Sequence, residues 1–213
     1  MMRALTPPVA RSARATGARL RRFARDEDGA LVLTEFLLLL PMLVWGFIAL
    51  FVYWDAFRTI NESQKASYTV ADLISRQGDV STAFINGMDD VMDFMVTNST
   101  GIRVRVTSVQ WDPANDRHYV LFSRSPGNAM PRLTTAQMRD LRDRIPVMAN
   151  LDGVVIIETE VDYTPAFSVG FDSILLAIGV DSQTFRNFVV TRPRGAARRI
   201  CLVESMSTCP AWM

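Results

Sequence analysis

The strongest pattern in the chain is an unbroken apolar run near its N-terminus. From Leu31 to Trp54 the chain continues for 24 residues with Glu35 as its only charged side chain. At 1.5 Å per residue, a helix of that length reaches about 36 Å, which crosses a bilayer core of about 30 Å with some tilt. The run predicts one transmembrane helix over residues 29–54.

A cleaved secretory signal is the first alternative, because it also joins a basic leader to an apolar region. Signal regions are about 7 to 15 residues long and end at a small-x-small site. The run here is longer and ends in the aromatic cluster Phe51-Val52-Tyr53-Trp54, which suits a membrane interface. A retained anchor is favoured over a signal or a transit peptide.

Helical periodicity continues past the apolar run, so residues 55–78 are predicted to extend the same helix up to a stop at Gly78. One face of the predicted helix consists of residues spaced three and four positions apart, and it is polar in its middle. Its members are Leu50, Tyr53, Phe57, Ile60, Gln64, Ser67, Ala71 and Ile74.

The remaining residues, 79–213, mix helical and strand patterns. Repeats of three and four predict short helices over 84–95 and, behind a cap at Thr134 or Thr135, over 141–148. Alternating or β-rich runs predict four strands, over 102–107, 118–124, 154–163 and 185–191. Turn residues at 112–116 join the first two strands in a hairpin. The predicted fold class is α+β, with a long N-terminal helix and a mostly antiparallel sheet packed against helices.

Charge is distributed unevenly along the chain. Residues 1–25 hold seven arginines and no acid, whereas residues 55–213 hold 16 basic and 18 acidic side chains. The positive-inside rule therefore places the leader, residues 1–28, in the cytoplasm. Attraction to anionic lipid explains the basic leader, and the basic tract 192–199 is short and lacks aromatics, so no nucleic-acid partner is predicted.

Candidate chemistry is sparse, and no catalytic residue, cofactor or metal site is predicted. His118 is the only histidine and lies in no catalytic motif. Asp112, Asn115 and Asp116 do not complete a calcium loop and are interpreted as turn caps. The carboxylates on the predicted second helix are interpreted as solvated; they are Asp89, Asp90 and Asp93.

Cys201 and Cys209 are the only cysteines. Topology places both in an oxidising compartment, so a disulfide is predicted, with two free thiols or a disordered tail as alternatives. Closing so short a loop would contribute roughly 2 to 3 kcal/mol in the chain-entropy model.

Glu35 and Pro41 are the unusual residues of the apolar run. A charge near the bilayer centre costs at least about 2.5 to 3.5 kcal/mol, so Glu35 is either paired and functional or reaches back toward the cytoplasmic headgroups. Pro41 removes a backbone hydrogen bond and is predicted to kink the helix.

The membrane junction resembles a known family. Arg22-Phe23-Ala24-Arg25-Asp26-Glu27-Asp28-Gly29-Ala30, followed by Glu35-Phe36-Leu37-Leu38-Leu39-Leu40-Pro41, is similar to the TadE/TadG-like family of tight-adherence pilus systems, which are bacterial pilin-like proteins. The resemblance implies a non-enzymatic minor pilin or pseudopilin of the inner membrane with a pilin-like periplasmic domain. Its implied partners are the bilayer, other pilin-like subunits, the pilus assembly platform and a prepilin peptidase.

The resemblance also implies roles for the junction residues. Gly29, Ala30 and Leu31 would be the peptidase-recognition junction, Glu35 would meet the freed N-terminal amine of a neighbouring subunit, and Pro41 would let the helix loosen. The family places its glutamate fifth after the cut, whereas Glu35 is sixth counted from Ala30. Either the cut follows Ala30 or the protein is never processed, in which case it is a single-pass periplasmic adaptor or scaffold.

Overall fold

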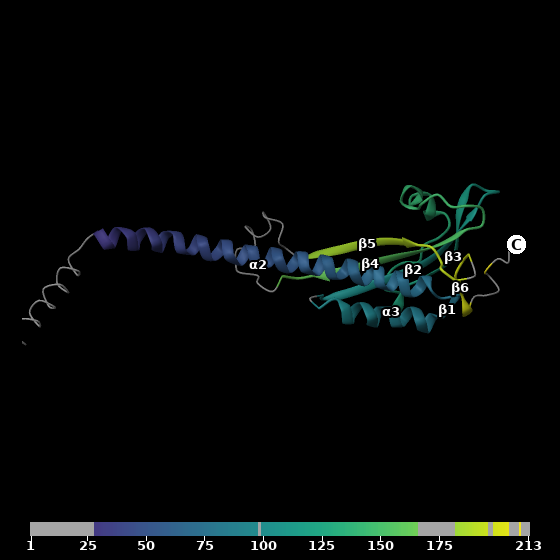
Figure 1. The fold of residues 1–213 in the computed structure, drawn as a ribbon, viewed down its shortest axis with the longest axis horizontal. Helices are drawn as coiled ribbons and strands as arrows, with labels where there is room; N and C mark the ends of the chain where they lie inside the picture. The colour runs from purple at the N-terminus through teal and green to yellow at the C-terminus, as the bar shows by residue number, and fades with distance from the viewer. Residues whose placement is uncertain (1–27, 98, 166–181, 196–197, 205–208, 210–213) are drawn as a thin grey trace, which may run out of the picture. The chain divides into compact units, whose positions relative to one another are not determined.

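The computed structural model describes residues 28–97, 99–165, 182–195, 198–204 and 209. The chain divides into two compact units, Met1–Leu50 and Phe51–Met213. A long apolar helix comes first and a small α+β domain follows, with the element order α2, β1, α3, β2, β3, three short 3₁₀ helices, β4, β5 and β6 (Figure 1). This confirms the predicted α+β class and the long N-terminal helix.

Helix α2 covers Asp28–Ser75 and ends three residues before the predicted stop at Gly78. Good helix formers dominate its apolar first part, which has no break at Pro41. The Gln77 amide closes the end of the helix with a 3.0 Å bond to the Ile74 carbonyl.

Helix α3 covers Thr82–Met95 and agrees with the predicted second helix. The Ser81 hydroxyl caps it by accepting a 3.1 Å bond from the Phe84 amide. Ile85, Met88 and Met92 recur by three and four and are buried.

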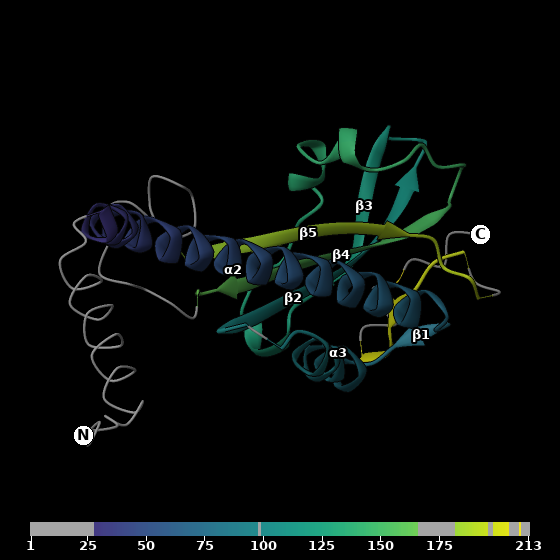
Figure 2. The ribbon, with the colours of Figure 1, turned by 60° about the vertical axis from the view of Figure 1, so that its left-hand side comes forward.

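The domain is built on a four-stranded antiparallel sheet in the order β3-β2-β4-β5 (Figure 2). Its strands are β2 (Gly101–Asp112), β3 (Arg117–Arg124), β4 (Gly153–Tyr163) and β5 (Gln183–Thr191). All four strands and the β2–β3 hairpin were predicted from alternation and turn chemistry.

One face of the sheet forms the main core with α3 and the last turns of α2 (Figure 2). Alternate strand residues such as Val104, Val106 and Ile157 point into this core and are fully buried. On the opposite face, beside the start of β2, Arg103 bonds to Glu160 and Asp162, and Arg105 bonds to Glu158. The two faces of β2 therefore differ as its alternating sequence predicts.

The predicted periodic face of α2 is buried only near its C-terminal end. Ser67, Ala71 and Ile74 are buried, but Phe57 is 60% exposed. In the preceding turns, the residues that the domain buries are Val52, Asp55, Thr59 and Ser63. Hydroxyl side chains can be buried here because each bonds to a carbonyl of the preceding helical turn.

The predicted helix over 141–148 is wrong. The segment instead contains a single 3₁₀ turn, Arg142–Arg144. Two other 3₁₀ turns, Pro126–Asn128 and Gln137–Arg139, lie between β3 and this segment. Pro146 cannot donate a backbone hydrogen bond and forces the preceding Ile145 into an extended conformation, with ψ 128°. Ile145 and Met148 are buried nonetheless, in a second core on the other face of the sheet.

A second, two-stranded sheet went unpredicted. Strand β1 (Asp79–Val80) pairs in parallel with β6 (Cys201–Leu202), which brings the C-terminal segment beside the connection from α2 to α3. Two-residue strands carry no periodicity, so the sequence gives no signal for them.

Candidate functional site

The predicted peptidase junction lies in the first turn of α2. Gly29, Ala30 and Leu31 are helical there, and Glu35 follows about one turn later. Val32 and the apolar residues up to Val44 all have exposed side chains. Among the described residues, one helix, α2, is both long enough and apolar enough to cross a membrane.

Pro41 lies inside α2, where it removes the hydrogen bond to the Leu37 carbonyl. The helical conformation nevertheless continues on both sides of it. That α2 loosens at Pro41 therefore stays a prediction.

Polar side chains of α2 and of the sheet contact one another along a line that we call the polar seam. Its members are Asp55, Thr59, Ser63 and Ser67 of α2 and Thr159, Tyr163 and Asn187 of the sheet. At one end, the Tyr163 hydroxyl donates a 3.1 Å bond to Asp55 Oδ2. Burial, followed by the bond to Asp55, raises the pKa of Tyr163 well above its usual range. Tyr163 is therefore a neutral donor that partners a buried carboxylate.

The middle of the polar seam is a hydroxyl and amide network. The Ser67 hydroxyl donates to the Ser63 carbonyl at 2.7 Å, so Thr159 is the donor in its own 2.8 Å bond to Ser67. The Asn187 amide donates to Thr159 at 3.2 Å and to the Ser63 hydroxyl at 3.3 Å. Every buried hydroxyl in this network has a partner, so the network can be buried at little cost.

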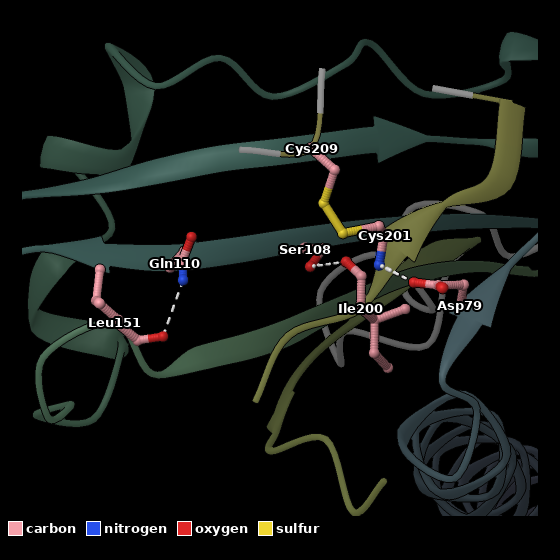
Figure 3. Close-up of a disulfide and its surroundings, with 7 residues drawn as sticks. All are labelled: Asp79, Ser108, Gln110, Leu151, Ile200, Cys201 and Cys209. Atoms are coloured by element: carbon pink, nitrogen blue, oxygen red, sulfur yellow. Dashed lines mark hydrogen bonds between the residues drawn. A yellow bond between two sulfur atoms is a disulfide. The ribbon is translucent and has the colours of Figure 1, made fainter. Parts of the chain in front are cut away.

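Cys201 and Cys209 are joined in a disulfide at the C-terminal end of the described chain (Figure 3). Hydrogen bonds join the adjoining segment to the domain. The Cys201 amide donates to Asp79 at 3.1 Å, the Ser108 hydroxyl donates to the Ile200 carbonyl at 2.7 Å, and the Gly153 amide donates to the Arg198 carbonyl at 2.8 Å. Gly153 lies against the same segment, and a Cβ there would lie 2.7 Å from the Arg198 carbonyl oxygen.

The carboxylates of the β2–β3 turn bond to neighbouring side chains of the same protein. Asp112 accepts a 2.7 Å bond from Asn115 and pairs with Arg117 at 3.4 Å. The Asn115 amide, reinforced by Arg117, holds the pKa of Asp112 below its usual range. Asp116 accepts two bonds from Arg142, at 3.0 and 3.2 Å. Turn capping is thus what Asp112 and Asn115 do, and the described residues contain no cluster suited to a metal ion.

His118 lies on β3 in a cluster that the sequence did not reveal. Its ring is 4.8 Å from the ring of Trp111, and the Arg142 guanidinium carbon lies 5.6 Å from that indole ring. Burial, with Arg142 adding to it, lowers the pKa of His118, so its imidazole is neutral at pH 7. Trp111 and Arg142 are 31 positions apart, and only the packing of the 126–152 segment on the sheet brings them together.

The interpretation of Asp89 as a solvated carboxylate is wrong. Its Oδ1 is buried and has no hydrogen-bond partner among the described residues. Burial, together with the nearby Asp93 and Asp90, raises the pKa of Asp89. Its neighbours Asp90 and Asp93 are exposed as predicted.

Comparison of the chain with protein-family models, with curated proteins and with solved structures finds no match.

Proposed function

We propose that the chain is a non-enzymatic minor pilin or pseudopilin-like protein that assists assembly of a tight-adherence type pilus in a bacterial inner membrane. In this proposal residues 1–28 are cytoplasmic, residues 29–54 cross the membrane, and the domain lies in the periplasm. The partners are other pilin-like subunits, the assembly platform and a prepilin peptidase.

A single observation carries the proposal. Helix α2 is apolar and exposed over its first part, and its later turns enter the core of an antiparallel α+β domain. An exposed apolar surface of this size needs a bilayer or a partner. The seven leader arginines favour a cytoplasmic N-terminus.

Glu35 supplies the mechanism that the proposal needs. It is the only charged residue between Leu31 and Trp54, and burying it unpaired costs at least about 2.5 kcal/mol at mid-membrane. Pairing with the N-terminal amine of a neighbouring subunit offsets the burial of both charges. The pair also fixes the position of one subunit along the next.

The test replaces Glu35 and measures both pilus formation and the mature N-terminus. Glu35→Ala should insert and fold normally but abolish pili, because the partner amine is left unpaired in a dry interface. Thr34→Ala is the matched control, since it removes a neighbouring polar group without changing charge, and it should form pili. Mass spectrometry should find the mature chain beginning at Ala30 or Leu31.

The second candidate is an unprocessed periplasmic adaptor or scaffold. It is favoured by the position of Glu35, which is sixth rather than fifth counted from Ala30. An adaptor would keep its leader and would not exchange Glu35 between subunits. A full-length N-terminus together with normal pili in the Glu35→Ala strain would overturn the pilin proposal in favour of the adaptor.

A further inference from the structure

The turn end of the β2–β3 hairpin carries two neighbouring clefts that pilus assembly through Glu35 does not use. Their volumes are about 430 and 490 Å³. His118 and Arg142 line both, so the clefts meet at these two side chains. β3 supplies His118, and the irregular segment after it supplies Arg142.

The first cleft, which we call the cationic cleft, is lined by three guanidinium groups and one carboxylate. Arg117 and Arg142 already pair with Asp112 and Asp116. Arg139 is exposed and has no ion-pair partner among the described residues. The cationic cleft therefore has excess positive charge, and a guanidinium group matches the geometry of a carboxylate.

The second cleft, which we call the apolar cleft, is lined on one side by consecutive apolar residues and on the other by His118, Arg142 and Asp143. Ile145, Pro146, Val147 and Met148 form one wall, and Trp111 contributes an aromatic ring. Val147 is 95% exposed, which is unusual for so large an apolar side chain. An apolar group placed here would remove both Val147 and part of the indole from water.

We propose that the paired clefts bind a carboxylate joined to an apolar group, with the carboxylate beside Arg139 and the apolar group against Val147 and Trp111. Charge complementarity in one cleft and an exposed apolar wall in the other select these two halves of the ligand. Both an acylated apolar amino acid and the free C-terminus of a peptide have this chemistry. The site is independent of the pilin proposal, because it involves neither the membrane segment nor Glu35.

The single histidine makes the proposal directly measurable. His118 lies between the clefts and is the only histidine of the chain, so its imidazole NMR signals report on this site alone. In the full chain held in nanodiscs, N-acetylphenylalanine should shift those signals saturably. Its neutral amide, which lacks the carboxylate, and acetate, which lacks the apolar group, should each bind at least about tenfold more weakly.

Two variants and a control separate binding from folding. Arg139→Gln should weaken binding about fivefold, as expected for one exposed charge pair, and Val147→Asp should weaken it further. Arg132→Gln changes an exposed arginine that lines neither cleft and should leave the affinity unchanged. An unfolding transition unchanged from that of the parent chain establishes that each variant is folded.

The outcomes decide both the proposal and the source of the ligand. Tighter binding of a tripeptide ending in phenylalanine than of N-acetylphenylalanine identifies a polypeptide C-terminus, whereas equal binding identifies a small carboxylate. An absent shift, equal binding of the amide, or unchanged binding by Arg139→Gln would overturn the proposal.

Discussion

The two parts of α2 relate hydrophobicity to burial in opposite ways. From Val32 to Val44 the helix is almost wholly apolar and its side chains are exposed. From Val52 to Ser75 the domain buries polar residues such as Asp55 and Ser63 while Phe57 stays exposed. The composition of a helix therefore indicates whether its exposed surface suits lipid or water. Which of its side chains a domain buries depends also on the hydrogen-bond partners that the domain offers.

The packed part of α2 itself changes character along its length. Its last turns contribute Ala66, Val70 and Ile74 to the main core, whereas its earlier turns form the polar seam. Burying a large apolar side chain is worth about 1.5 to 3 kcal/mol, and a hydrogen bond about 0.5 to 1.5 kcal/mol. The last turns of α2 therefore supply most of the free energy that α2 contributes to folding of the domain. The polar seam fixes the position of α2 on the sheet.

The largest expected effect contrasts the two parts directly. Ile74→Ala should lower the free energy of unfolding of the domain by about 2 to 5 kcal/mol, because it opens a cavity in a fully buried site. Leu43→Ala, in the exposed apolar part, should leave domain unfolding unchanged. Denaturant unfolding of the full chain in detergent, followed by its tryptophan fluorescence, measures both. Equal losses from the two variants would contradict the division of α2.

A smaller effect tests the polar seam. Tyr163→Phe removes the donor to Asp55 and should cost about 1 to 3 kcal/mol, because a buried carboxylate loses a hydrogen bond. The control is Tyr68→Phe, which removes the hydroxyl of a tyrosine that is 65% exposed. Both are read out by the same unfolding measurement. If Tyr163→Phe lowers the free energy of unfolding no more than Tyr68→Phe does, the bond from Tyr163 to Asp55 in the polar seam does not stabilise the domain.

The smallest effect concerns Asp89, a partly buried carboxylate without the partner that Asp55 has. Its pKa is raised above the unfolded value of about 3.9, so ionisation disfavours the folded state and stability falls as pH rises through the folded-state pKa. Asp89→Asn should therefore stabilise the domain at neutral pH, by less than about 1 kcal/mol because solvent screens this partly exposed group. The gain should vanish below a pH of about 3, where the carboxyl is protonated in both states. Thermal unfolding at the two pH values checks this, and a gain independent of pH would contradict it.

Local patterns predicted most of the elements because each follows from neighbouring residues. The alternation of Ile102, Val104 and Val106, with turn residues after β2, was enough for the hairpin. Residues 141–148 were misread because Leu141, Ile145 and Met148 have helical spacing in a segment that is a 3₁₀ turn followed by irregular backbone. Pro146 already argued against a helix.

The features that sequence missed depend on contacts between distant residues. The polar seam joins Asp55 to Tyr163 and Ser67 to Thr159, and no spacing rule connects such pairs. The face of α2 that the domain buries contains Thr59, whereas the periodic face predicted from the sequence contains Phe57. The Trp111–Arg142 cluster was hidden in the same way, and a lone histidine gave no reason to look for it.

The most direct test of the account uses two positions of α2 with nearly equal exposure. Leu43 is 66% exposed and Tyr68 is 65% exposed, yet in a membrane-spanning α2 the first would lie in lipid and the second in water. Spin labels attached to Leu43→Cys and Tyr68→Cys in the full chain, reconstituted in a bilayer, measure collision with oxygen and with a polar nickel complex. If α2 spans the membrane, oxygen should relax the label at 43 and nickel should relax the label at 68. Relaxation of both labels by nickel would contradict a membrane-spanning α2.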